Sequence, residues 1–324
     1  MAGAGRRKTE SMRNGMLSIY KEAGFTSNDV VAKLRGILHM RRIGHTGTLD
    51  PMAEGVLPVC LGNATRLCDM IADRDKEYRA VMRLGLRTDT QDMTWAILEE
   101  APPEVLSGIT ESGIREAAES FIGDYSQIPP MYSALKVNGQ RLYDLARQGK
   151  TVERKARQIR IHELEVLEIA MPFVTMRVRC SKGTYIRTLC EDIGSRLGCG
   201  GTMDSLLRTR VGQFTLENSW KLSQLEEIMR EDPERIARLI APVDSFFEDA
   251  PAGVVADDAI RFLANGNRLL RRQVRFDRGM QPADGGQVRM YNGEGVFFGV
   301  YTYSAGQGAF LPLKMFLPDA YRKS

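Results

Sequence analysis

One stretch of the chain reads Gly44-His45-Thr46-Gly47-Thr48-Leu49-Asp50-Pro51 and continues through Met52-Ala53-Glu54 into the apolar run Gly55-Val56-Leu57-Pro58-Val59-Cys60-Leu61-Gly62. Glycine at positions 44 and 47 permits backbone angles that other residues resist. Pro51 fixes its own φ angle and biases Asp50 toward an extended conformation. The apolar run predicts a buried strand over 56–61. Asp50 is therefore a carboxylate held in a rigid loop before a strand, although shape alone would also suit an ordinary Asp-Pro turn.

The composition is that of an ordinary globular protein. The chain has 324 residues, of which 43% are hydrophobic and 27% are charged, which is enough for one large domain and a small one. The net charge of +4 permits nucleic acid as a partner without demanding it. Five widely spaced cysteines form neither a disulfide framework nor a zinc motif, so we expect a reducing cytoplasm.

The sequence carries no signal for membrane insertion or secretion. It has no apolar run of 18 residues, so no spanning helix is predicted. The first residues include Arg6, Arg7 and Lys8 but no apolar core of a signal peptide. We expect residues 1–15 to form a disordered tail.

Basic residues gather in three places along this nearly neutral chain. They are Lys33, Arg35, Arg41 and Arg42; then Arg147, Lys150, Arg154, Lys155, Arg157 and Arg160; then Arg268, Arg271, Arg272, Arg275 and Arg278. One such cluster alone usually forms a solvated face. Three of them favour binding to phosphates, and we take Arg41, Arg42, Arg141 and Arg154 as candidates for contacts with nucleic-acid phosphates.

Hydrophobic periodicity predicts an α+β fold. The clearest helix, over 28–40, places Val30, Val31, Leu34, Ile37 and Leu38 on one face, with Ser27 or Asn28 as N-cap. Further helices are predicted over 65–73, 110–121, 142–149, 184–197 and 257–264, strands over 17–20, 56–61, 78–84, 158–169, 174–180, 296–301 and 310–316, and a tight turn at Asn138-Gly139. We expect a mixed or antiparallel sheet with flanking helices over 16–250 and a small β-rich domain over 251–324.

The quoted stretch closely resembles the catalytic loop of the bacterial TruB family of tRNA pseudouridine synthases, G-H-T-G-x-L-D-P followed by G-x-L-P-x-C-L-G. Three further segments resemble the same family in the same order: Lys76-Glu77-Tyr78-Arg79-Ala80, Gln127-Ile128-Pro129-Pro130-Met131-Tyr132-Ser133-Ala134-Leu135-Lys136 and Ser181-Lys182-Gly183-Thr184-Tyr185-Ile186-Arg187-Thr188-Leu189. The resemblance runs from about residue 17 to residue 214. It implies a pseudouridine-synthase sheet followed by a PUA-like RNA-binding domain.

The resemblance also implies roles for individual residues. Asp50 is the essential catalytic residue, Arg187 pairs with it, and Tyr78 stacks on the target base. The substrate-binding residues are His45, which fills the RNA loop after base flipping, Asp92, which joins the ion network, and Lys136 at the end of the 127–136 block. Tyr185, beside the bound base, and Leu206, an apolar wall residue of the pocket, complete the set. Without the family, Tyr78 would be an aromatic residue in a half-buried strand and Arg187 a helix-surface partner of Glu191. His45 would be read as a general base.

The implied reaction breaks the bond from uridine N1 to C1′, turns the base over and rejoins it through C5. It needs no redox change, metal or cofactor, but the nucleotide must be flipped out of the RNA. Positive charge on the ribose requires an ionised Asp50 and hence a cationic partner. Asp50 attacks C1′ or removes the C2′ proton, and the sequence leaves both open. Tyr78 is a candidate base for the C5 proton.

The implied substrate is the uridine at position 55 in the T-arm of tRNA, modified by a monomer that needs no guide RNA or protein partner. Two alternatives stay open: the related archaeal and eukaryotic synthases that work with guide RNA, and an RNA-binding or tRNA-folding module whose benefit is not catalytic. The intact 127–136 block and Ala53-Glu54 favour the bacterial type. The chain departs from the family at Tyr20-Lys21-Glu22, where D-K-P is usual, and at Met93-Thr94-Trp95.

Overall fold

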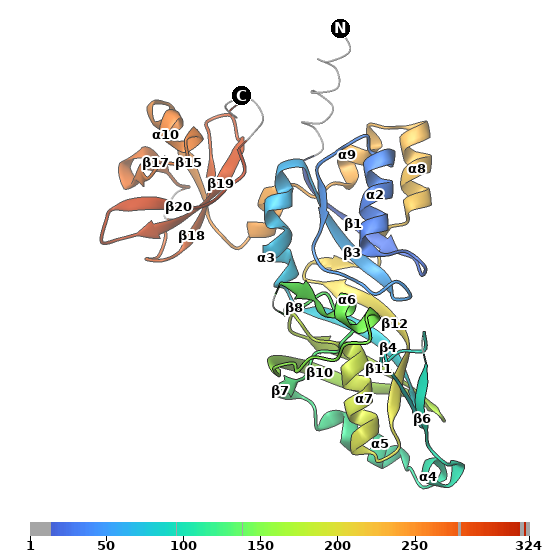
Figure 1. Cartoon of the computed structure of the whole chain (residues 1–324). Coiled ribbons are helices and arrows are strands. Elements are labelled where there is room, and N and C mark those ends of the chain that lie inside the picture. Colours follow the sequence, from blue (N-terminus) through green and yellow to red (C-terminus); the bar gives the residue numbers. More distant parts are fainter. Residues whose placement is uncertain (1–13, 95, 138, 278–279, 318–320, 322–324) are drawn as a thin grey trace.

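A computed structural model of the chain describes residues 14–94, 96–137, 139–277, 280–317 and 321. Its core is a ten-stranded mixed sheet in which eight strands follow the order β14-β1-β3-β12-β4-β11-β10-β7, while β2 pairs with β3 and β13 with β12 (Figure 1). These strands are β1 (Gly15–Lys21), β2 (Ile43–His45), β3 (Glu54–Leu61), β4 (Lys76–Leu84), β7 (Gly123–Gln127), β10 (Arg157–Ala170), β11 (Phe173–Cys180), β12 (Gly201–Val211), β13 (Phe214–Thr215) and β14 (Ser219–Trp220). The strands predicted in this region are confirmed.

Strand β12 lies at the centre of the sheet, although the sequence did not predict it. It pairs with β4 in antiparallel and with β3 in parallel orientation. Its register shifts twice, between Met203 and Ser205 and between Arg208 and Arg210. Because each bulge adds an unpaired residue, the alternation of apolar and polar side chains that marks a strand is interrupted here.

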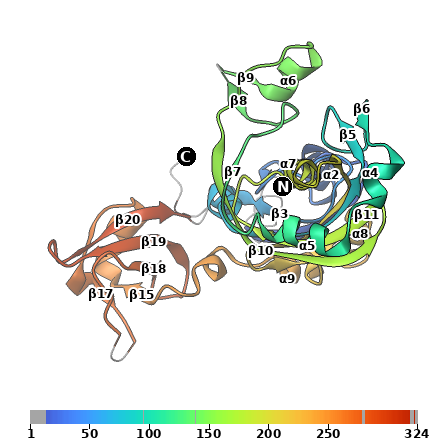
Figure 2. The same ribbon diagram turned by 90° about the horizontal axis from the view of Figure 1, so that it is seen from below.

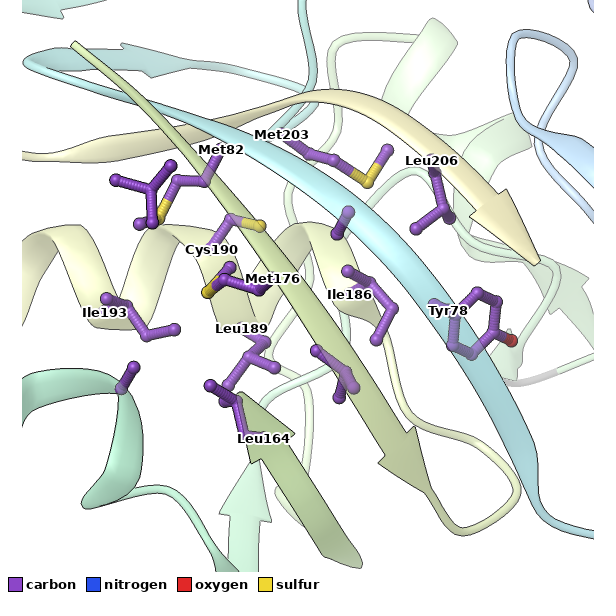
Figure 3. Packing of buried hydrophobic residues seen from close by; sticks show 14 of the residues in the cluster. Tyr78, Met82, Leu164, Met176, Ile186, Leu189, Cys190, Ile193, Met203 and Leu206 are labelled. Atoms are coloured by element: carbon purple, nitrogen blue, oxygen red, sulfur yellow. The ribbon is translucent and has the colours of Figure 1, made fainter. Parts of the chain in front are cut away.

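Helices cover both halves of the sheet. They are α2 (Ser27–Ile37), α3 (Cys68–Ala72), α4 (Pro103–Ser107), α5 (Glu111–Glu119), α6 (Leu142–Arg147), α7 (Ile186–Arg196), α8 (Leu222–Glu231) and α9 (Arg235–Leu239), with 3-10 turns η1 (Gly62–Leu67) and η2 (Val243–Phe247). In one core cluster, residues of α7 pack with residues of β4, β11 and β12 (Figure 3). In another, α2 and α8 pack on β1 and β3.

Two helix predictions need correction at their ends. Helix α2 starts after Thr26, which forms a capping box with Asp29, rather than after Ser27 or Asn28. It ends at Ile37, and His39 beyond it has a φ of 53°, which is incompatible with helix continuation. The predicted helix over 65–73 is a 3-10 turn followed by the short α3. The other predicted helices agree with the structure within a few residues.

Two small hairpins lie beside the main sheet. Strands β5 (Leu86–Thr88) and β6 (Ile97–Glu100) form one, and β8 (Lys136–Val137) and β9 (Gln140–Arg141) form the other. The second hairpin and α6 stand away from the main sheet (Figure 2). The predicted turn includes Asn138, which lies outside the described residues, and Gly139 has a φ of +81°.

The C-terminal region forms a six-stranded sheet in the order β16-β20-β19-β18-β15-β17. Its elements are β15 (Ala252–Val255), η3 (Asp257–Ala259), α10 (Ile260–Ala264), β16 (Leu269–Leu270), η4 (Arg271–Gln273), β17 (Val274–Arg275), β18 (Gln287–Tyr291), β19 (Phe297–Ser304) and β20 (Ala309–Met315). Val300 and Phe316 pack in one buried cluster with Val56 and Phe247. The Asn63 side chain donates to the Phe316 carbonyl at 3.2 Å, so η1 is joined to this sheet.

The predicted tail covers residues 1–15, of which 1–13 lie outside the described residues. The two remaining residues are ordered, which corrects the prediction for them: Gly15 begins β1, and the Asn14 side chain accepts a hydrogen bond from the Asn63 amide at 2.8 Å. In the described part of the chain, no helix has the length and apolar character needed to cross a membrane.

Candidate active site

The loop that carries Asp50 connects β2 to β3 and is held by a buried cation beneath it. The Lys21 ammonium, at the end of β1, donates to the carbonyls of Ala53 at 2.6 Å and Pro51 at 2.9 Å. The Leu49 amide donates to the Ser27 hydroxyl at 2.9 Å. Because backbone groups on both sides of Asp50 are bound, its carboxylate has a defined position. These contacts exist although Glu22 stands where the family usually has proline.

Asp50 forms an ion pair with Arg187, which lies at the start of α7. Arg187 Nε is 3.0 Å from Asp50 Oδ2, and the Arg187 side chain is only 5% exposed, whereas that of Asp50 is 39% exposed. Asp92 Oδ2 lies 3.8 Å from Arg187 Nη1. One buried guanidinium thus faces two carboxylates, of which Asp50 is the one that a substrate can reach.

Arg187 is held in place by backbone groups as well. Its Nη1 donates to the Thr90 carbonyl at 2.8 Å and its Nη2 to the Tyr132 carbonyl at 2.9 Å. Glu191, four residues along the helix, instead lies 3.6 Å from Arg87. The reading of Arg187 as a surface partner of Glu191 is therefore wrong.

Asp92 is oriented by the loop that follows β5. Its Oδ1 accepts a hydrogen bond from the Thr90 hydroxyl at 2.8 Å and from the Thr94 amide at 3.0 Å. Thr94 belongs to the segment in which this chain departs from the family pattern. The departure therefore preserves a contact to Asp92, and Trp95 lies outside the described residues.

Tyr78 and Leu206 come together from neighbouring strands beside Asp50. Tyr78, on β4, is 8% exposed, and it belongs to one buried cluster with Ile186 and Leu206 (Figure 3). The same cluster contains Leu49, the residue before Asp50. Burial raises the pKa of Tyr78 to about 12, so its hydroxyl is protonated at neutral pH in the free protein. Tyr185 sits just before α7, where its backbone exchanges two hydrogen bonds with the Gln127 side chain at 2.8 and 3.0 Å.

His45 is the last residue of β2 and is partly buried. Its Nδ1 accepts a hydrogen bond from the Gly47 amide at 3.4 Å, which fixes the tautomer with the proton on Nε2. Burial and the charge of Arg208 lower the pKa of His45. The ring is thus neutral at pH 7, and it shares no described hydrogen bond with Asp50.

The predicted RNA-contact residues differ in the exposure of their side chains and in the hydrogen bonds that these side chains make within the protein. Arg41, Arg141 and Lys136 are exposed, and Lys136 and Arg141 line one cavity at the β8-β9 hairpin. Arg42 is exposed, and its Nε donates to the Thr65 hydroxyl at 2.8 Å. Arg154 is different because its Nη1 donates to a backbone carbonyl at 3.1 Å and its Nε is buried.

The structure does not bring Lys136 into the Asp50 network: no described hydrogen bond or ion pair joins them. It adds Lys21, Gln127 and Arg208, which sequence reasoning did not assign to the site. The sequence held one sign of a buried role for Lys21 and Arg208, because each is a basic residue among apolar residues on a strand. Within the described residues, no group of three or more His, Cys, Asp or Glu side chains is arranged to hold a metal ion.

Comparison with known proteins agrees with this arrangement. Residues 35–186 match the family described as TruB family pseudouridylate synthase (N terminal domain), and residues 187–248 match the tRNA pseudouridylate synthase B C-terminal domain. The chain is similar to the tRNA pseudouridine synthase B of Lachnoclostridium phytofermentans, with 49% identity over 94% of this chain and 100% of the relative. The enzyme of the same name from Cupriavidus pinatubonensis is 42% identical over 87% of each chain.

Two solved structures share the fold. The crystal structure of a Cbf5-Nop10-Gar1 complex matches with a TM-score of 0.70 and 28% identity, covering 97% of this chain and 88% of that chain. The structure of an H/ACA RNP bound to a substrate RNA containing 2′-deoxyuridine matches with a TM-score of 0.70 and 25% identity, over 98% and 89%. The matched family domains and the identity to these relatives over nearly the whole chain show that this protein belongs to the TruB family of pseudouridine synthases.

Proposed function

We propose that this protein converts the uridine at position 55 in the T-loop of tRNA to pseudouridine, without a metal, cofactor or guide RNA. The observation that carries the proposal is the 3.0 Å pair between Arg187 and a solvent-accessible Asp50, whose neighbour Leu49 packs in one buried cluster with Tyr78 and Leu206. Breaking the glycosidic bond develops positive charge on the ribose, which an ionised carboxylate stabilises. The buried guanidinium of Arg187 pairs with that carboxylate at 3.0 Å.

The reaction has a simple atom balance. A C5–C1′ bond replaces the C5–H bond, and an N1–H bond replaces the N1–C1′ bond, so one proton leaves C5 and one reaches N1. Asp50 acts on the ribose, either as a nucleophile at C1′ or as the base that removes the C2′ proton. We assign removal of the C5 proton to the anionic form of Tyr78, with Tyr185 and Leu206 on either side of the flipped base.

The remaining contacts serve recognition of the RNA. We assign Arg41, Arg42, Arg141 and Lys136 to phosphates, because their side chains are exposed, and His45 to stacking in the opened loop. Arg154 is a weaker candidate because its guanidinium is bound within the protein. We further propose that residues 16–250 form the catalytic domain, that residues 251–324 form a PUA-like RNA-binding domain, and that the protein works as a monomer.

The guide-dependent alternative is less favoured. The solved structures described above are an H/ACA RNP with a substrate RNA and a Cbf5-Nop10-Gar1 complex, so the fold by itself suits a synthase in an assembly as well as one that works alone. The relatives named tRNA pseudouridine synthase B are far more similar in sequence, at 42–49% identity. We therefore place this protein with enzymes that modify tRNA alone.

The test uses an unmodified tRNA transcript and the purified protein with nothing else added, followed by mapping of pseudouridine to single nucleotides. We expect one pseudouridine, at position 55. Asp50→Asn should bind the transcript and form none, whereas the control Asp124→Asn, which loses only an exposed pair with Arg160, should retain activity. Modification at another position, or modification by Asp50→Asn, would refute the assignment.

Tight tRNA binding without modification would favour the guide-dependent or tRNA-folding alternative instead. Adding a guide RNA to the same reaction separates the first of these from the second. A folding role in addition to catalysis is tested with Asp50→Asn, which should still accelerate refolding of a misfolded tRNA if binding alone is sufficient.

A further inference from the structure

Arg208 is a buried cation that faces Tyr78 across the centre of the main sheet. It is 2% exposed, and in the antiparallel pairing of β12 with β4 its Cα is the direct partner of that of Tyr78. Directly opposed residues project their side chains to the same face of a sheet. The Arg208 guanidinium accordingly hydrogen-bonds to the Tyr78 hydroxyl oxygen.

The same guanidinium also binds backbone carbonyls on both sides of Asp50, one in the loop that carries Asp50 and one in β3. Its Nε donates to the Val56 carbonyl at 2.7 Å, and its Nη2 donates to the Gly47 carbonyl at 3.4 Å. Arg208 therefore connects the loop of one proposed catalytic residue to the side chain of another.

Among the residues that the structure describes, no carboxylate pairs with the charge of Arg208, and Tyr78 is the one titratable group that favours its charged form. A buried cation is costly unless it is paired, and bonds to two carbonyls could be made by a neutral donor. Burial raises the pKa of Tyr78, and the charge of Arg208 and its hydrogen bond are the influences that lower it.

Two neighbouring buried cations show what a purely structural role looks like. The Lys21 ammonium donates to three backbone carbonyls, and the Lys76 ammonium to two. Neither has a described hydrogen bond to the side chain of a proposed catalytic residue. Arg208 differs from both because one of its partners is the Tyr78 hydroxyl.

We propose that Arg208 is a positioning residue for proton transfer: it holds the hydroxyl oxygen of Tyr78 and stabilises the anionic form of Tyr78 that accepts the C5 proton. This inference rests on the proposed function, since it assigns Arg208 to the same reaction. Tyr78, which is protonated in the free protein, first gives its hydroxyl proton to solvent. The C5 proton then passes to the Tyr78 oxygen, the electron pair of the C5–H bond returns to the ring, and N1 takes a proton from solvent.

The test compares single-turnover rates on tRNA transcripts that carry hydrogen or deuterium at C5 of the target uridine. For Arg208→Met we expect a rate at least about tenfold below wild type, a larger deuterium isotope effect, and a dissociation constant for tRNA within about threefold of wild type. Arg208→Lys keeps the charge and should recover part of the rate and lower the isotope effect again. Unchanged isotope effects in both variants would overturn the proposal.

A double-mutant cycle with Tyr78→Phe shows whether Arg208 acts through the Tyr78 hydroxyl. We expect Arg208→Met to cost little further rate once that hydroxyl is gone, and an equal loss in both backgrounds would refute the assignment. If Tyr78→Phe turns over too slowly to measure, the isotope effects decide alone. Leu225→Ala, which opens a cavity in the distant cluster under α8, controls for lost stability and should keep the wild-type isotope effect.

The two proposals fail in different ways. If the wild-type protein makes no pseudouridine in tRNA, the proposed function is wrong. If the wild type is active and the Arg208 variants lose rate only in proportion to their stability, the function stands and Arg208 is a structural clamp. Where Arg208→Met does not fold, Arg208→Lys with the deuterated transcript still distinguishes these outcomes.

Discussion

Substitution of Arg187 by methionine should affect both the stability and the activity of this protein. The change keeps an apolar stem of similar length and removes the guanidinium, which binds two carbonyls and faces the carboxylates of Asp50 and Asp92. Removing one partner of a buried pair costs about 3–5 kcal/mol. Because the Asp50 side chain is 39% exposed, water can solvate it in the variant, and we take the lower end, about 3 kcal/mol.

That loss corresponds to a fall in melting temperature of about 6–12 °C for a domain of this size, measurable by calorimetry. Loss of a preorganised charge at a reacting group typically lowers the rate by about 100-fold or more, which single-turnover pseudouridine formation would measure below the new melting temperature. Arg187→Lys keeps the charge but loses the fork geometry and should be intermediate in both. A wild-type rate in Arg187→Met would refute the role of the ion pair in catalysis, and an unchanged melting temperature would refute its role in stability.

Three further predictions concern other groups. Burial lowers the pKa of Lys21 to about 8, below its value in the unfolded chain. The native state therefore binds fewer protons than the unfolded state between pH 8 and 10.5, and it gains stability as pH rises. The free energy of unfolding of wild type minus that of Lys21→Met should increase over this range, and a flat difference would contradict the shift. Arg141→Gln should reduce the slope of log affinity for tRNA against log salt by about 0.7–0.9. Arg154→Gln should leave that slope unchanged and lower the melting temperature, because the Arg154 guanidinium donates to the backbone. A reduced slope in Arg154→Gln and an unchanged slope in Arg141→Gln would show that Arg154 is the phosphate ligand. Asn63→Ala removes the hydrogen bonds from η1 to the end of the C-terminal sheet. The free energy of unfolding should fall by about 1–3 kcal/mol, and limited proteolysis between the two sheets should become faster. An unchanged digestion pattern would contradict this prediction.

Local sequence was sufficient for most of the elements in the catalytic region. The stripe formed by Ile114, Ala117 and Ala118 predicted the buried face of α5, and the structure confirms it. The alternation along 174–180 predicted β11, which is likewise confirmed. Such elements are predictable because each depends on a side-chain period that repeats within a few residues. Strand β12 was missed because its two bulges interrupt that period.

The sequence by itself determined the chemistry that is available: a carboxylate in a glycine- and proline-restricted loop, an aromatic residue on a strand, and an arginine at the start of a helix. Only the tertiary structure decided their partners. Arg187 has Glu191 within reach on its own helix, yet it binds Asp50, 137 residues away in the chain. Arg208 likewise meets Tyr78 through the register of β12 against β4. Sequence spacing cannot encode such pairs, because the geometry of a buried charge depends on which strands lie side by side and on what water the fold excludes.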